Sequence, residues 1–231
     1  MIFPGKYSWL WPLLVLAPTF LTGCVDGPLY RLWYRRQWLD DEQYGPTLYT
    51  RLEELDGLRR DVPGMSMAEQ DQLAVRLNRA VVEDPSVIYR AEATRTLGSL
   101  STPRAAEGLH HATGDPEPSV RRAACQAWGE RGDAQALQML GQLLRTDADL
   151  DVRITAAREL GRFSDPAAVN ALAVALDHQD PALQLRAMRS LEQVTGEDFG
   201  NHVPAWRQYV RGDPVDRPEP PSMVSRLRNL F

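Results

Sequence analysis

The stretch that decides the fold is residues 149–176, DLDVRITAARELGRFSDPAAVNALAVAL. Its first half places Val152, Ala156 and Leu160 at positions i, i+4 and i+8. Its second half repeats this spacing over residues 168–176. Apolar residues at these intervals line one face of an α-helix. The stretch therefore predicts two amphipathic helices joined by a short turn that contains a glycine.

The same pattern recurs along the chain. VIYRAEATRTLG, SVRRAACQAWG, DVRITAARELG and ALQLRAMRSLE align so that Gly98, Gly129 and Gly161 share a column, which ends at Glu192. The three glycines are 31 and 32 residues apart. Two further columns hold small and large apolar residues: Ala93, Ala124, Ala156 and Ala187, then Leu97, Trp128, Leu160 and Leu191. Regular self-similarity is the signature of a repeat architecture, whose units bury their apolar faces against one another.

The second half of each unit begins with helix-start residues. Thr102, Asp133 and Asp165 each lie four residues after a column glycine, and all three are types that cap helix N-termini. Pro103 and Pro166 follow two of these caps, at the favoured first helical position. We therefore expect each repeat to be a pair of helices.

These columns carry a family resemblance. The unit resembles HEAT repeats, in particular the short bacterial variety of phycobilisome lyases, with the pattern D-P-x-V-R-x-A-A-x-x-L-G-x-x-x-D-x-x-A-x-x-x-L. The match covers about residues 84–210, although Tyr89 replaces the apolar valine of the first unit. The resemblance implies an all-α fold, a right-handed α-solenoid of HEAT-like helix pairs (an ARM-type superhelix). It says almost nothing about activity.

The repeats, with a C-terminal cap, are predicted to occupy residues 84–211. Residues 47–83 are interpreted as a divergent leading helix pair, whose second helix starts with a capping box at Ser66-Met67-Ala68-Glu69. Trp206 and Tyr209 are expected to close the other end, because a terminal repeat lacks a neighbour that would cover its apolar face.

The first 23 residues are predicted to be a lipoprotein signal peptide. Lys6 precedes an apolar run over residues 8–21, which is shorter than the ~20 residues that span a bilayer. Residues 21–24, Leu-Thr-Gly-Cys, resemble the lipobox of bacterial lipoproteins. That resemblance implies cleavage after Gly23, lipidation of Cys24, and an exported protein anchored by lipid to the inner or the outer envelope membrane. An uncleaved signal anchor is the alternative.

Residues 24–46 are expected to form an aromatic and basic stalk. Tyrosine, tryptophan and arginine alternate here, so the segment either lies on the membrane surface or packs on the solenoid as a cap. Residues 212–231 are interpreted as a Pro-rich linker and a short amphipathic tail with Met223, Leu227 and Leu230 on one face. The tail docks back, stays disordered, or binds a partner or anionic lipid. In overall look the chain resembles envelope proteins of planctomycete-type bacteria.

The sequence contains few residues whose pattern indicates catalysis or metal binding. His110 and His111 are adjacent, so on a helix they point about 100° apart and do not share a metal. Cys125 lies inside a predicted helix, where a buried apolar role is expected, and Lys6 is the only lysine. No metal and no cofactor are predicted. The net charge of −5 at pH 7 does not indicate a nucleic-acid-binding protein.

A fourth column allows two interpretations. It holds Arg90, Arg121 and Arg153 and ends at Gln184. These arginines either form a stripe that binds an anionic ligand, or pair within the structure with an acid near a neighbouring joint, such as Glu117, Asp149 or Asp180. We favour the structural role.

The predicted function is a membrane-anchored, non-catalytic scaffold that binds an unidentified protein partner in the bacterial cell envelope. The candidate binding residues are Arg122 and Arg158, just past the small-residue columns, together with Met223, Leu227 and Leu230 of the tail. The alternative is a lyase-like enzyme or enzyme accessory, by analogy with bilin lyases. That analogy rests on the repeat family alone.

Overall fold

The computed structural model describes residues 45–215, and these residues form helices and connecting turns without a β-strand. The chain divides into two compact units, and the boundary between them lies between Arg51 and Leu52. The account below is of the second unit, from Leu52 onward. The helices are α3 (Leu48–Asp61), the 3-10 helix η2 (Val62–Gly64), α4 (Met67–Glu83), α5 (Val87–Gly98), α6 (Pro103–Ala112), α7 (Pro118–Arg131), α8 (Ala134–Thr146), α9 (Leu150–Leu160), α10 (Pro166–Leu176), α11 (Pro181–Thr195) and α12 (Val203–Arg211).

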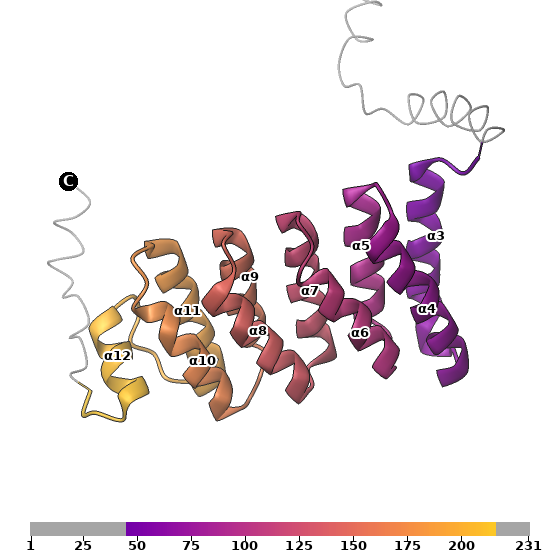
Figure 1. The fold of residues 1–231 in the computed structure, drawn as a ribbon. Helices are drawn as coiled ribbons and strands as arrows, with labels where there is room; N and C mark the ends of the chain where they lie inside the picture. The colour runs from indigo at the N-terminus through magenta and orange to yellow at the C-terminus, as the bar shows by residue number, and fades with distance from the viewer. Residues whose placement is uncertain (1–44, 216–231) are drawn as a thin grey trace, which may run out of the picture. The chain divides into compact units, whose positions relative to one another are not determined.

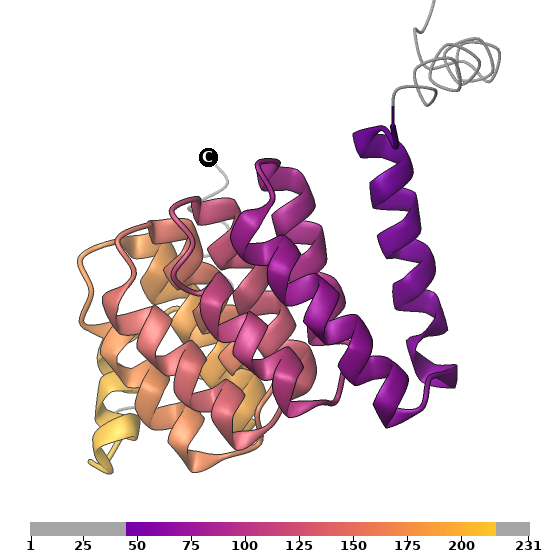
Figure 2. The same ribbon diagram turned by 45° about the vertical axis from the view of Figure 1, so that its right-hand side comes forward.

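From α5 onward the helices pack as successive pairs. Helices α5, α7, α9 and α11 contact one another in sequence, and we call them the first helices of the repeats. Their partners α6, α8 and α10 lie along one side of this row (Figure 1), and Figure 2 shows the arrangement from a second direction. This is an all-α solenoid, as the repeat columns predict.

The helices begin where the sequence places caps. Thr102, Asp133 and Asp165 are the N-caps of α6, α8 and α10, and each side chain accepts a hydrogen bond from a backbone N–H of the first turn. Ser66 and Glu69 form the predicted capping box of α4, in which the Ser66 backbone N–H donates to Glu69 Oε2 at 2.7 Å. Such caps satisfy donors that otherwise lack a partner in the helix.

The apolar columns form the core. The column alanines Ala93, Ala124, Ala156 and Ala187 have 0% of their surface exposed, and so do Leu97, Trp128, Leu160 and Leu191. Alanine at the centre of a helix contact allows the two backbones to approach closely. The predicted placement of Leu160 in the core is confirmed.

The predicted glycine turn is confirmed at Gly161, which lies in the turn between α9 and α10, and is wrong at Gly98 and Gly129, which lie within helices. Gly98 is the last residue of α5, Gly129 lies inside α7, and Gly161 caps α9 with a φ of −63°. None of the three adopts the left-handed conformation for which turns favour glycine. The turn after α7 instead uses Gly132, with a φ of 64°.

The column glycines make room for the next first helix. A Cβ atom at Gly98 would lie 2.7 Å from the Cα of Ala127, and one at Gly129 would lie 2.9 Å from the Cβ of Glu159. Both contacted residues belong to the following first helix. Glu192 occupies this column in α11 and is exposed, and within the described residues no further first helix follows it.

Aromatic residues cover the core next to α12. Trp206 is 1% exposed and its ring lies 4.9 Å from that of Phe199, centroid to centroid, while the Tyr209 ring lies 6.1 Å from Trp206. Trp206 Nε1 donates to the carbonyl of Gly200 at 3.0 Å, so the buried indole is satisfied. Helix α12 contacts both α10 and α11, as expected of a terminal cap.

Several predictions fall outside the described residues. They are the signal peptide, Cys24, the stalk up to residue 44, and the tail with Met223, Leu227 and Leu230. Within residues 45–215, no helix combines the length and the apolar character that crossing a bilayer requires.

Candidate functional site

The arginine column lies in the joints between repeats. The Arg90 guanidinium donates to both oxygens of Asp115, from Nε at 2.8 Å and from Nη2 at 3.1 Å. Its Nη1 donates to the backbone carbonyl of Asp84, at the start of its own repeat. One side chain therefore connects the beginnings of two consecutive repeats, and 11% of the Arg90 side chain and 6% of the Asp115 side chain are exposed.

The next joint repeats this geometry. Arg121 donates to Asp147 from Nε at 2.8 Å and from Nη2 at 2.9 Å, and its Nη1 donates to the Asp115 carbonyl at 2.9 Å. The hydrogen bonds to Asp115 and Asp147 raise the pKa of Arg90 and of Arg121 respectively, against the opposing effect of burial. The acids that pair with these arginines are not the expected ones. Asp115 lies two residues before Glu117, and Asp147 lies two residues before Asp149.

The third joint departs from the first two. His178 stands where Asp115 and Asp147 stand, and its Nε2 lies 2.9 Å from Arg153 Nη1. Its Nδ1 accepts a hydrogen bond from the Asp180 backbone N–H at 3.0 Å. Arg153 Nε is buried and has no hydrogen-bond partner among residues 45–215. This joint therefore has an arginine but no carboxylate, and the geometry of all three joints supports the structural interpretation of the column.

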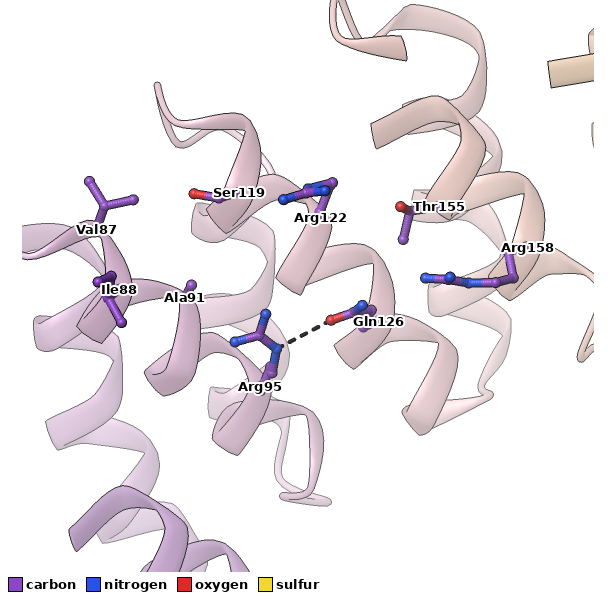
Figure 3. A pocket seen from close by; sticks show the side chains of 9 residues that line it. All are labelled: Val87, Ile88, Ala91, Arg95, Ser119, Arg122, Gln126, Thr155 and Arg158. Atoms are coloured by element: carbon purple, nitrogen blue, oxygen red, sulfur yellow. Dashed lines mark hydrogen bonds between the residues drawn. The ribbon is translucent and has the colours of Figure 1, made fainter. Parts of the chain in front are cut away.

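A groove of about 420 Å³ crosses three first helices. Its lining residues come from α5, α7 and α9: Val87, Ile88, Ala91, Arg95, Ser119, Arg122, Gln126, Thr155 and Arg158. We call this surface the arginine groove. Figure 3 shows that Arg95 meets Gln126 across the boundary of two repeats, and that Arg158 extends from α9 toward α7.

The arginine groove brings together both sequence-predicted arginines, Arg122 and Arg158. Arg122 is exposed and, within residues 45–215, has no hydrogen bond or ion pair. Arg158 donates only from Nε, to Glu159 Oε1 at 3.2 Å, so its terminal nitrogens are open to a ligand. Among the nine lining residues of the groove there is no carboxylate.

Sequence reasoning missed the rest of the groove. Arg95 donates from Nη1 to Glu92 at 2.9 Å and from Nε to Gln126 at 3.2 Å, which leaves Nη2 open. Arg95, Gln126 and Arg158 are 31 and 32 residues apart, the repeat interval. They therefore form a column of long polar side chains, and this is the signal that could have identified Arg95.

The possible nucleophile and general bases lie elsewhere. Cys125 is fully buried, and burial raises the pKa of its thiol far above the ordinary value. Its Sγ lies 3.9 Å from the Val152 carbonyl. His202 Nδ1 accepts a hydrogen bond from the Ala205 backbone N–H as the cap of α12. Neither residue lines the groove.

A second depression lies beside α6, with a volume of about 430 Å³. It contains His110 and His111, whose ring centroids are 6.5 Å apart and whose planes are nearly perpendicular. Arg131 at the edge of this depression donates to the Leu100 carbonyl and to Asp133, so its guanidinium group is already paired within the protein. Over the described part of the chain, no group of three or more histidine, cysteine, aspartate or glutamate residues could hold a metal ion.

Comparison with protein-family models supports the architecture. A family model described as HEAT repeats matches residues 75–153 and 139–205. A solved structure of human deoxyhypusine hydroxylase in complex with glycerol is similar, with 21% sequence identity and a TM-score of 0.49; the match covers 54% of this chain and 44% of that one. This chain thus spans less than half of that protein, and no curated protein matches it. Because the two family matches together cover more than half of the sequence, the chain belongs to the family of HEAT-repeat proteins.

Proposed function

We propose that this protein is a membrane-anchored, non-catalytic scaffold that binds another protein in a bacterial cell envelope. The observation that carries the proposal is the arginine groove, which extends over three repeats and presents Arg122, a residue with no hydrogen bond or ion pair to residues 45–215. The repeat arginines Arg90 and Arg121 are engaged in the joints, so a binding role falls to the arginines of the groove.

The shape of the groove favours a macromolecular ligand. Successive repeats each contribute one helix to it, and solenoids use such continuous surfaces to bind extended partners. The lining residues supply guanidinium, hydroxyl and amide groups but no general base held beside a nucleophile. Binding of a partner protein requires only the guanidinium, hydroxyl and amide groups and no catalytic pair. We therefore do not propose the lyase-like alternative.

The anchor is supported by the sequence alone. Residues 21–24, Leu-Thr-Gly-Cys, follow an apolar run that suits a signal peptide, and Cys24 would carry the lipid. Several buried acyl chains give durable membrane binding, whereas one chain gives only marginal binding. Anchoring would hold the repeats at a surface, where a partner diffuses in two dimensions.

Two measurements in the native host test the proposal. For the anchor, the intact mass of the wild-type protein should include acyl groups, and the mass of Cys24→Ser should not. A wild-type protein without acyl mass would contradict the anchor.

For the scaffold role, chemical crosslinking in intact envelopes followed by mass spectrometry should recover a specific protein partner. Turnover of a small molecule by the purified protein, abolished by one polar substitution that leaves the thermal midpoint unchanged, would contradict a non-catalytic role.

A further inference from the structure

We infer that the arginine groove binds an extended, acidic segment of the partner protein, with carboxylates about three residues apart. The inference rests on the proposed function, because it assumes that the ligand is a protein. It adds the chemistry of the segment that is recognised and the residues that recognise it.

The first argument is charge. The groove carries Arg95, Arg122 and Arg158 and no carboxylate among its lining residues, although the chain as a whole has a net charge of −5. Complementary charge favours an acidic ligand and raises the rate of its association.

The neighbouring acids do not neutralise this surface. Glu159 is shared by two arginines, Arg158 at 3.2 Å and Arg162 at 3.1 Å. Glu92 is likewise shared, by Arg95 at 2.9 Å and by Arg59 at 3.7 Å. Arg59 also pairs with Glu130 at 3.1 Å, so arginines and carboxylates balance at the α5 end. At the α9 end two guanidinium groups face one carboxylate, and Arg122 pairs with no acid within residues 45–215, so positive charge remains on the groove.

The second argument is spacing. Arg95, Arg122 and Arg158 belong to three consecutive first helices, and packed helices lie about 8–10 Å apart. A chain in the extended polyproline II conformation advances about 3.1 Å per residue with three residues per turn, so every third side chain lies on the same face, about 9 Å further along. A segment that crosses the three helices therefore brings every third side chain, roughly, to the next helix: to Arg95 on α5, to Gln126 and Arg122, one turn apart, on α7, and to Arg158 on α9. A helical ligand advances only about 1.5 Å per residue and would need twice that separation or more.

The third argument is the rest of the lining. The Ser119 hydroxyl has no hydrogen-bond partner within the described residues and is available to a peptide backbone. At the α5 end, Ile88 is 60% exposed beside Val87 and offers an apolar contact. The segment is therefore expected to carry an apolar residue at one end of its acidic run.

The test is a binding titration with the purified full chain. The probe is a fluorescent ten-residue peptide with one leucine followed by glutamates at every third position, separated by glycine and serine. Two comparison peptides replace the glutamates by lysine or place the same glutamates consecutively. Vesicles containing phosphatidylglycerol form a fourth arm, because an anionic lipid surface would also attract arginines.

We expect the spaced glutamate peptide to bind more tightly than the consecutive one, and the lysine peptide not to bind. Arg122→Glu should weaken binding, and Arg122→Glu combined with Arg158→Gln should weaken it about tenfold. Arg76→Glu is the matched control, since Arg76 is exposed in the middle of α4, outside the groove and without an ion pair in residues 45–215. The Arg76→Glu variant should bind the spaced glutamate peptide with the same affinity as the wild type.

Three outcomes would overturn the inference: no binding of the spaced peptide, equal weakening by Arg76→Glu, or binding of the vesicles but not of the peptide. Thermal midpoints of the variants separate loss of binding from loss of folding. If envelope crosslinking recovers a partner while the acidic peptide does not bind, the inference fails and the scaffold proposal stands.

Discussion

Arg121 and Asp147 connect two consecutive repeats through a pair of parallel hydrogen bonds of 2.8 and 2.9 Å. Only 14% of the Arg121 side chain and 4% of the Asp147 side chain are exposed. Asp147 also accepts the backbone N–H of Asp149, the N-cap of α9, at 2.9 Å. The same carboxylate therefore orders the start of one repeat and holds the arginine of the repeat before it.

Removing this carboxylate should destabilise the solenoid strongly. Asp147→Ala leaves a largely buried guanidinium without its partner, and breaking such a pair costs about 3–5 kcal/mol. Urea unfolding followed by circular dichroism measures the loss. Asp71→Ala is the control, because the Asp71–Arg104 pair is 42% and 49% exposed and should be worth no more than about 1 kcal/mol. Equal losses for the two variants would contradict the structural role of the bridge.

Restoring the missing bridge should stabilise the protein. His178→Asp gives the third joint the carboxylate that the first two have, opposite Arg153, whose Nε has no hydrogen-bond partner in the described part of the chain. Replacement by the residue that the other repeats use at a position commonly adds about 0.5–2 kcal/mol. The gain should disappear in the background of Arg153→Gln. If the His178→Asp variant is less stable than the wild type, a carboxylate at position 178 does not restore the bridge seen in the first two joints.

A methyl group should be tolerated at one helical glycine and not at another. Gly129→Ala places a Cβ atom 2.9 Å from that of Glu159, and overpacking of this kind costs about 1–3 kcal/mol. Gly57→Ala in α3 meets nothing within 4 Å and should stabilise the helix, by about 0.5–1 kcal/mol. Thermal unfolding compares the two. The close-approach role of the column glycines is wrong if both substitutions stabilise.

Cys125 should be chemically silent in the folded protein. Its thiol is buried and its pKa is raised by loss of solvation, so little thiolate forms at pH 8. Iodoacetamide at pH 8 should leave Cys125 unlabelled until urea unfolds the chain, and peptide mapping distinguishes it from Cys24. Rapid labelling under native conditions would instead indicate an accessible, reactive cysteine.

The sequence predicts the fold because the repeat interval allows the units to be aligned with one another. Leu97, Trp128 and Leu160 recur in register, and all are fully buried, so alignment of the units identifies core positions directly. The caps at Thr102 and Asp133 are equally local, since a cap depends only on the few residues that follow it. Local and periodic features of this kind are visible without coordinates.

Features that depend on the packing of repeats against one another were predicted less well. The repeat pattern predicts a turn at Gly129, whereas the glycine lies inside α7, because its contact, Glu159, lies in the next repeat and cannot be seen in the sequence of one unit. The sequence predicts that Arg121 pairs with an acid near a neighbouring joint, with Asp149 among the examples; the partner is Asp147, because the choice between nearby acids depends on how the joint folds. The groove combines faces of three helices, so Arg95 became apparent only in the structure.

The central claim, that a partner protein binds in the arginine groove, is tested most directly by site-specific photo-crosslinking in the native host. Ser119→p-benzoylphenylalanine places the crosslinker in the groove, and the same replacement at Gln142, an exposed position of α8, is the control. We predict that irradiation of intact cells joins position 119, and not position 142, to one protein, at a segment rich in spaced carboxylates. Crosslinks to lipid alone, or the same products from both positions, would contradict the account.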